Sequence, residues 1–290
     1  MLQHWWQVIT VGCLAVLAVA GVILARTTAL PRTLSYNLVR QVAAGHAAWQ
    51  TSNWLEIEST HFRLRYQQED AAIAAMVLEN AEEVYSPAGA MLDHEPHGKT
   101  LIILYPDRES LAYQFGWAAS ESAMGVYWGG VIRILSPLDW APGSNLDEIA
   151  RIFTTSGPVA HELAHLLVDE KTRGNYPRWL TEGIAQYVEK ELTGFIMPGS
   201  GGADGWYPLE VMDYGFDNLP DQSLAYRQSF LMVDYLMERG GLPALRRILE
   251  LLGRGATTDG AFREVLGTGI AAFEEAFTRE FPANKFSQGL

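Results

Sequence analysis

Cysteine is nearly absent from this sequence, whose 290 residues include only Cys13. One cysteine can form neither an intrachain disulfide nor a cysteine-based zinc site, so histidine and carboxylate side chains must hold any metal. Basic residues are also scarce, since 21 lysines and arginines face 34 aspartates and glutamates and give a formal net charge of −13. Phosphate backbones are bound by clustered basic side chains, and we find no basic stripe, so we expect no nucleic-acid partner.

Long apolar runs are rare, and one stands out near the start of the chain. Val8 to Ala25 contains no charged residue, and two tryptophans precede it while an arginine follows it. As a helix this run would span about 27 Å, close to the thickness of a bilayer core. We predict a retained transmembrane anchor at residues 1–25. The alternative is a cleaved secretory signal with its cleavage site at Ala18-Val19-Ala20.

The next segment, residues 26–50, is predicted to be a juxtamembrane linker that is helical from Leu34 to Trp49. Its arginines would place this side of the membrane in the cytoplasm by the positive-inside rule alone. A large domain can cross the membrane regardless of local charge, so these residues do not decide the side. We expect a single-pass membrane protein whose N-terminal helix contacts lipid and whose soluble domain lies outside the cytoplasm. The arginines are Arg26, Arg32 and Arg40.

Strand signals are confined to residues 51–155. Glu58–Tyr66 alternates apolar and polar residues, Thr100–Tyr105 is a continuous apolar run, and Met124–Leu135 is typical of a hairpin that turns at Gly129-Gly130. Helical periodicity covers Asp70–Leu92. Residues 156–290 are almost purely helical in pattern. We therefore predict an α+β fold, with a small N-terminal sheet and helices followed by a helical C-terminal part. The expected C-terminal helices cover residues 158–170, 177–192, 223–239, 243–253, 259–266 and 269–281.

The sequence His161-Glu162-Leu163-Ala164-His165 is an H-E-x-x-H motif. Residues four apart lie on one face of a helix, so both imidazoles can reach one ion while Glu162 lies beside them. The rest of the helix is apolar, and buried polar side chains must be satisfied by some partner. A pair of hydrogen-bonded core histidines is the alternative explanation.

A second motif follows in Pro177–Tyr187, which is predicted to open another helix. Its Glu182 comes sixteen residues after His165, and a turn at Arg173–Tyr176 can fold it back against the histidines. Two histidines and one carboxylate are a common ligand set of catalytic zinc. Gly183 is expected to let the two helices approach each other closely. The alternative for Glu182 is a surface carboxylate, although its neighbours are mostly apolar.

HELAH followed by PRWLTEGIAQY resembles the gluzincin zinc metallopeptidases, specifically the peptidase MA-like family, and the resemblance extends from about Glu58 to the C-terminus. It implies a zincin-like metallopeptidase domain over residues 51–290 that acts on a peptide or protein substrate. It also implies one zinc ion per chain, with His161, His165 and Glu182 as ligands and Glu162 as general base. Thermolysin-type enzymes have an aspartate four residues after the ligand glutamate. Here that position is Gln186, which we expect to hydrogen-bond a ligand imidazole less strongly.

Zinc-assisted amide hydrolysis also needs a second group that stabilises the oxyanion. Tyr226 is our candidate, because similar peptidases supply a tyrosine or histidine from a helix after the ligand glutamate. Core packing is its alternative, and Tyr235 is a weaker candidate. The strand Val131–Leu135 is expected at the cleft edge, where it would pair with the substrate backbone. No cluster that would recognise a substrate terminus is evident, so we expect an endopeptidase.

Two other readings of the sequence compete with the enzyme. A catalytically silent binding or scaffold protein could keep the zincin fold, but a structural site needs only the ligands and not Glu162. An intramembrane protease would require the motif inside the long apolar run, which lies far upstream.

His94 and His97 could form a rival metal site, and we expect them instead to be solvated loop residues. His61 is expected at the surface.

Overall fold

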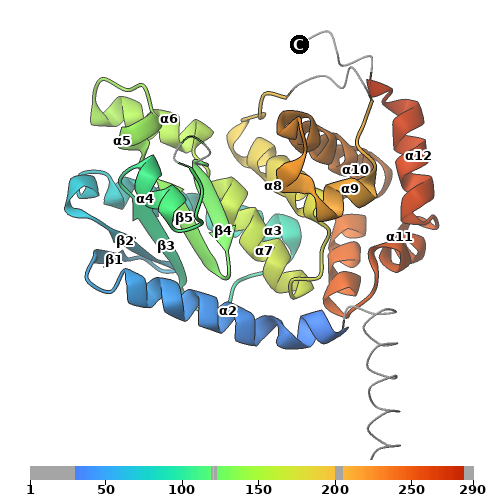
Figure 1. The fold of residues 1–290 in the computed structure, drawn as a ribbon, viewed down its shortest axis with the longest axis horizontal. Coiled ribbons are helices and arrows are strands. Elements are labelled where there is room, and N and C mark those ends of the chain that lie inside the picture. Colours follow the sequence, from blue (N-terminus) through green and yellow to red (C-terminus); the bar gives the residue numbers. More distant parts are fainter. Residues whose placement is uncertain (1–29, 119, 121–122, 200–204, 284–290) are drawn as a thin grey trace, which may run out of the picture.

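The computed structural model describes residues 30–118, 120, 123–199 and 205–283 (Figure 1). The membrane anchor or signal predicted at residues 1–25 lies outside these ranges. No helix within the described ranges combines the length and apolar character needed to cross a membrane. The α+β class is confirmed, because a five-stranded sheet packs with helices in the first half and helices alone follow it.

The sheet is mixed, with the strand order β1-β2-β3-β5-β4. β2 (Phe62–Tyr66), β3 (Thr100–Tyr105) and β5 (Val131–Leu135) run parallel in its centre. β1 (Leu55–Glu58) and β4 (Gly125–Trp128) are antiparallel edge strands. The predicted strand β3 and the predicted hairpin are thereby confirmed.

Two strand predictions need correction. The expected single strand Glu58–Tyr66 is a hairpin, because β1 ends at Glu58 and the Ser59 amide donates to the Phe62 carbonyl across a turn. Val131–Leu135 is expected at the cleft edge and paired with substrate, but it is an interior strand buried along its whole length, so its backbone is already paired on both sides. Strands buried on both faces carry near-continuous apolar sequence, and VIRIL is mostly of this kind. The edge strand is β4.

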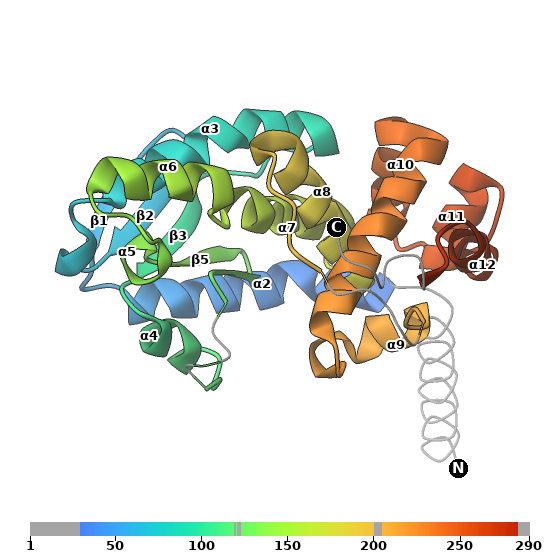
Figure 2. The ribbon, with the colours of Figure 1, turned by 90° about the horizontal axis from the view of Figure 1, so that it is seen from above.

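Helices cover both faces of the sheet (Figure 2). On one face, α3 (Ala74–Leu92) and α7 (Val159–Thr172) form the main core with Ile102 and Ile132. On the other face, α2 (Leu30–Gln50) and α4 (Arg108–Tyr113) cover a smaller cluster of Ala47, Leu101, Ile103 and Leu135. The helix predicted at Leu34–Trp49 is confirmed within α2. This segment, predicted as a linker, packs against the sheet through Ala43 and Ala47.

The second half consists of helices around α8 (Arg178–Thr193) and α10 (Gln222–Gly253). α10 contains both of the helices predicted at 223–239 and 243–253, which meet at a kink where Gly241 has φ 61° and ψ −168°. Three short helices, α5, α6 and α9, were not predicted, because they are brief or lie in loop-like sequence. The other helices are η1 (Gln68–Asp70), α5 (Pro137–Trp140), α6 (Leu146–Ser156), α9 (Leu209–Tyr214), η3 (Phe216–Asn218), α11 (Thr258–Leu266) and α12 (Ile270–Glu280).

Candidate metal centre

The turn between α7 and α8 brings the two sequence motifs together. Arg173 and Gly174 adopt left-handed conformations with φ of 55° and 72°, and the Gly174 amide donates to the Asp169 carbonyl. A left-handed residue commonly ends a helix and satisfies its last carbonyls. α8 then begins after Pro177 and runs back along α7 (Figure 1). The expected reversal of the chain at this turn is confirmed.

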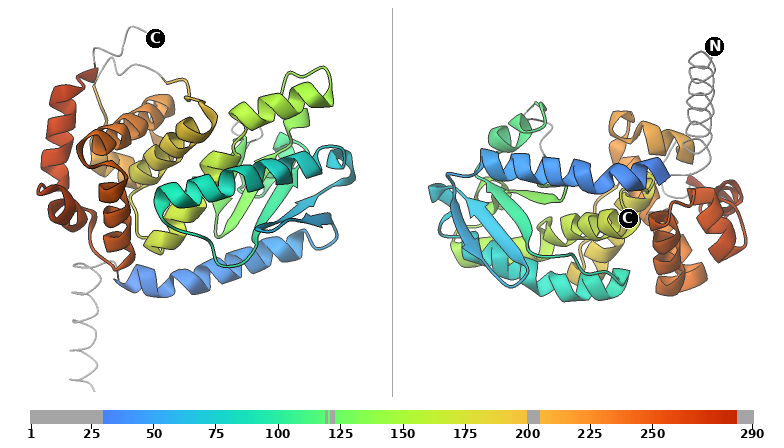
Figure 3. Two further views of the ribbon diagram at one scale, coloured as in Figure 1. Left: turned by 180° about the vertical axis from the view of Figure 1, so that it is seen from behind. Right: turned by 90° about the horizontal axis from the view of Figure 1, so that it is seen from below.

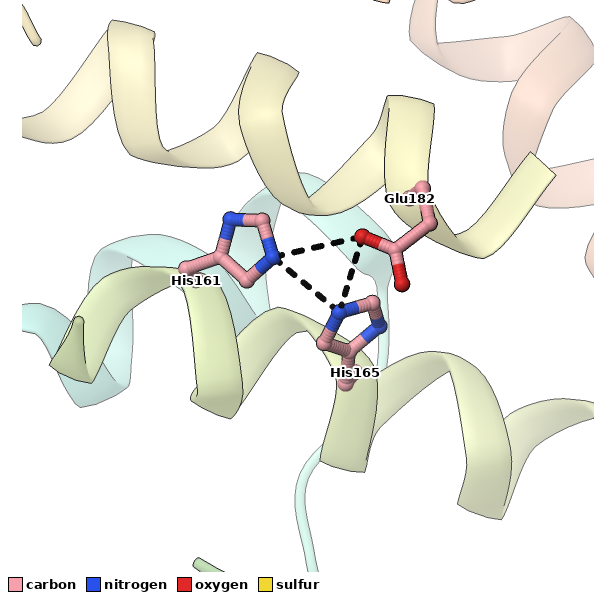
Figure 4. Close-up of side chains that lie close together, drawn as sticks. All are labelled: His161, His165 and Glu182. Carbon is pink, nitrogen blue, oxygen red and sulfur yellow. Dashed lines mark hydrogen bonds and ion pairs between the residues drawn. The ribbon is translucent and has the colours of Figure 1, made fainter. Parts of the chain in front are cut away.

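Three side chains converge between these helices (Figure 4). The Nε2 atoms of His161 and His165 lie 3.1 Å apart, and Glu182 Oε2 lies 3.5 Å and 3.6 Å from them. All three residues are buried, and one ligand atom from each falls within 4.8 Å of the others. The described residues contain no other group of three or more such side chains that could hold a metal. The structure thus brings together the ligands that the motifs predict.

The two carboxylate oxygens of Glu182 have different environments. Oε1 pairs with the Arg178 guanidinium at 3.1 Å, whereas buried Oε2 has no hydrogen-bond partner among the described residues. Burial on its own would raise the pKa of Glu182, but the charges of Arg178 and His165 outweigh it and hold the pKa well below its ordinary value. Glu182 is therefore an ionised carboxylate with one oxygen directed at the two imidazoles.

The outer nitrogen of each imidazole also has a partner. His161 Nδ1 lies 3.3 Å from Glu189 Oε2, and His165 Nδ1 lies 2.7 Å from Thr181 Oγ1. Such partners orient ligand histidines and select the tautomer that leaves Nε2 free. Sequence reasoning missed both residues. Glu189 follows Glu182 by seven positions, two helical turns along the same face, and that spacing could have identified it.

Gln186 does not take the place expected for it. Its Nε2 donates to the backbone carbonyls of Glu182 and Tyr226, at 3.2 Å and 2.8 Å, so it joins α8 to α10. Gly183 allows the close approach of α8 to α10, and not the expected close approach of α8 to α7. A Cβ atom at Gly183 would lie 2.2 Å from the Ser229 carbonyl oxygen, which requires glycine there. Both expectations were wrong because the sequence does not reveal which helix packs on which face of α8.

Glu162 lies on α7 beside the cluster, buried, and faces the edge strand β4. The Tyr127 amide donates to Glu162 Oε2 at 2.6 Å. Burial raises the pKa of Glu162 above its ordinary value, against the charges of His161 and His165. Gly125 allows this close approach, because a Cβ there would lie 2.8 Å from Glu162 Oε1. A carboxylate with a raised pKa in this position is suited to accept and release a proton.

The two candidate tyrosines occupy different parts of the molecule. Tyr226 packs edge-on against Phe216, and the charge of Glu182, followed by burial, raises the pKa of its phenol. Tyr235 is buried in the C-terminal aromatic cluster, against Phe273 and Phe277.

Two of the other histidines, His94 and His61, make structural contacts. His94 Nε2 lies 3.0 Å from Glu170 Oε2 and is only partly exposed, so the prediction of a solvated loop residue is wrong for it. His97 is exposed, as expected. His61 is partly exposed, pairs with Glu82 at 2.6 Å and stacks on Tyr85.

Comparisons with known proteins give one family match, over part of this chain. Residues 148–281 match the family model described as Peptidase MA superfamily, and the match includes α7, α8 and α10. Among solved structures, the fold is similar to Legionella pneumophila aminopeptidase A in complex with aspartic acid, with 12% sequence identity and a TM-score of 0.47. That alignment covers 78% of this chain and 28% of the other, so this chain spans less than a third of that protein. A comparison with curated proteins found no match.

Proposed function

We propose that this chain is a membrane-anchored zinc metallopeptidase, a hydrolase that cleaves peptide bonds in a peptide or protein substrate. The observation that carries the proposal is the convergence of His161, His165 and Glu182 within 4.8 Å, inside the region that matches the Peptidase MA superfamily. The apolar run Val8–Ala25 is the basis for proposing the membrane anchor.

The cluster has the chemistry that zinc requires. A buried carboxylate oxygen without a hydrogen-bond partner is costly, and here it faces two imidazole nitrogens. A divalent cation bound by His161, His165 and Glu182 would satisfy all three atoms at once. Two histidines and one carboxylate favour zinc over magnesium or calcium, which prefer oxygen ligands. Glu182 is ionised and needs to lose no proton to bind the ion.

Zinc held in this way acts as a Lewis acid that makes water a nucleophile near neutral pH. Glu162 would accept the proton released by that water and later deliver it to the leaving amine. The Tyr127 amide fixes one oxygen of Glu162, which leaves the other available for proton transfer. We assign Tyr226 to the oxyanion, because its phenol keeps its proton at neutral pH and can donate a hydrogen bond.

The substrate backbone would pair with β4, the edge strand next to α7. Gly125 and Tyr127 face Ile134 and Ile132 of β5 at positions whose own amides and carbonyls point toward the outer edge. The Tyr127 amide already donates to Glu162, so a peptide would pair with the other outward backbone groups of β4. An extended peptide added at this edge would lie next to Glu162. The sequence shows no cluster that would recognise a substrate terminus, so we propose an endopeptidase.

The first experiment measures zinc per chain in the full-length protein, in wild type and in Glu182→Ala. We expect about one zinc in wild type and a loss of at least tenfold in affinity in the variant. Glu191→Ala, on the same helix but exposed, is the matched control and should keep its zinc. Equal zinc in Glu182→Ala and in the control would overturn the ligand set.

The second experiment screens a peptide library for cleavage by wild type and by Glu162→Gln. The variant should bind zinc normally and lose activity by about 10² to 10⁴-fold, since it cannot take the proton. A zinc-loaded wild type that cleaves nothing, together with a biological effect that survives Glu162→Gln, would favour the alternative of a binding or scaffold protein.

A further inference from the structure

Helix α2 has two apolar faces, and the larger side chains are on the outer one. The inner face contacts the sheet through Ala43 and Ala47, which are 7% and 2% exposed. We call the opposite side the outer face of α2. It presents large apolar residues that are between 60% and 73% exposed, namely Leu38, Val39, Val42 and Trp49.

The spacing of these residues places them on one side of α2. At 100° per residue, they lie within roughly 100° of the helix circumference, an arc that also contains His46. Arg40 and Ala47 lie on the other side of the helix, and Ala43 lies at the border between the two sides. Single exposed apolar residues need no explanation, but four on one side of one helix form a patch. In the view from below, α2 lies in front of the sheet with its long axis along the side of the molecule (Figure 3).

The charge of α2 differs from that of the rest of the chain. Leu30–Gln50 contains no aspartate or glutamate, although the whole chain has a formal charge of −13. Its two arginines and its histidine make it neutral to basic. Two carboxylates of α7 contact α2: Asp169 accepts a hydrogen bond from Tyr36, and Glu170 pairs with Arg40 and His94. This face would therefore not be repelled by anionic lipid headgroups.

We propose that the outer face of α2 lies in the headgroup and upper acyl region of a lipid bilayer. An amphipathic helix of this kind binds in the plane of the membrane with its apolar side buried. The apolar run Val8–Ala25 ends only four residues before α2 begins, and this inference rests on the membrane anchoring proposed above. Trp49, near the C-terminal end of α2, is of the residue type that prefers the membrane interface.

Contact with lipid at α2 would also hold the candidate active site in a fixed orientation. The Tyr36 hydroxyl donates to Asp169 on α7 at 2.6 Å, and Arg40 pairs with Glu170 on the same helix. The turn of the β4–β5 hairpin lies against α2, because a Cβ at Gly129 would meet Ala43 at 2.6 Å. The helix that carries both histidines and the edge strand that faces them are thus both attached to α2.

The experiment places a fluorescent probe on α2 of the full-length chain. Replacement of the single native cysteine, Cys13→Ser, allows labelling at Val42→Cys, and Leu38→Cys provides a second site on the same face. Leu146→Cys is the control, because Leu146 is 48% exposed on α6, on the other side of the sheet from α2 (Figures 1 and 2). Each protein is reconstituted in phosphatidylcholine–phosphatidylglycerol vesicles that contain brominated lipid.

We expect brominated lipid to quench the probe at positions 42 and 38 by about twofold or more, and dissolved iodide to quench it little. The probe at position 146 should show the reverse. Equal lipid quenching at positions 42 and 146 would overturn the inference. Shielding from iodide without lipid quenching would also overturn it, since a protein surface would then cover α2. Zinc content and peptide cleavage, measured on the same samples, would show separately whether the proposed function holds.

Discussion

At the scale of single residues, the centre of this protein depends on how hydrogen bonds are distributed around three candidate ligands. Arg178 occupies one oxygen of Glu182 and leaves the other for the imidazoles. Glu189 and Thr181 occupy the outer nitrogens of the histidines. Each candidate ligand thus has one atom held by the protein and one atom directed at the same point, which preorganises the site for a cation.

Glu189→Gln should weaken zinc binding without abolishing it. The amide that replaces the carboxylate carries no charge, so the His161 ring would be oriented less firmly and would be a weaker base. Loss of such an outer partner typically costs 10- to 100-fold in metal affinity. Competition with a chelator measures the affinity. Glu191→Gln on the same helix is the control, and an equal affinity in both variants would show that Glu189 has no part in binding.

At the scale of elements, α8 is the central helix, because it packs against α7 on one side and α10 on another. Gly183 and Gln186 both face α10, where Gly183 admits the backbone of Ser229 and Gln186 bonds the Tyr226 carbonyl. These two residues, which follow Glu182 on α8, therefore position the helix that carries Tyr226. This packing determines whether the phenol lies beside the candidate metal site.

Gly183→Ala and Gly45→Ala should have opposite effects on stability. The added methyl at Gly183 would meet the Ser229 carbonyl at 2.2 Å and push α8 and α10 apart, at a cost of about 1 to 3 kcal/mol in unfolding free energy. At Gly45, on exposed α2, nothing lies within 4 Å, so alanine should stabilise the helix by about 0.5 to 1 kcal/mol. Denaturant unfolding measures both. A neutral effect of Gly183→Ala would contradict the close packing of α8 on α10.

At the scale of the whole molecule, α2 joins parts that lie far apart in sequence. Asp169 of α7 accepts hydrogen bonds from Tyr36 of α2, Tyr127 of β4 and Tyr176 of the α7–α8 turn. The adjacent Glu170 binds Arg40 of α2 and His94. Removal of residues 1–50 would delete Tyr36 and Arg40 and expose the sheet face that Ala43 and Ala47 cover. We therefore expect the intact chain to be the form that folds correctly and is suited to experiments.

The contribution of Glu170 to the stability of the fold should depend on pH. Burial on its own would raise its pKa, but the hydrogen bond with His94 and the charge of Arg40 outweigh burial and hold the pKa below its ordinary value of 4.5. A carboxylate with a lowered pKa in the folded state stabilises the fold above its unfolded pKa and loses that contribution as pH falls through the folded value. Glu170→Gln should therefore lower the unfolding free energy by about 1 to 2 kcal/mol at pH 7.

The difference in unfolding free energy between wild type and Glu170→Gln should shrink as the pH falls below 4.5, which is the ordinary pKa of a glutamate. Denaturant unfolding at a series of pH values measures it. Glu275→Gln, at an exposed site on α12, is the control and should change stability little at any pH. A difference for Glu170→Gln that stays constant down to low pH would show that ionisation of Glu170 does not help to dock α2.

Features that depend on local spacing could be predicted from the amino-acid sequence. Two histidines four residues apart share a helix face, and a short turn returns Glu182 to them, so the candidate ligand set could be predicted without coordinates. The strand β3 and the β4–β5 hairpin followed from short apolar runs and a Gly-Gly turn. These features involve neighbours in sequence, whose geometry the backbone itself restricts.

Features that depend on residues far apart in the chain became visible only in the folded structure. The packing of the elements makes β4 rather than β5 the edge strand and places Gly183 against α10. It also brings Glu189, and not Gln186, to His161. The docking of α2 on α7 joins Tyr36 to Asp169, which are separated by 133 positions. Long-range packing selects one partner among many chemically suitable ones, and local sequence carries little information about that choice.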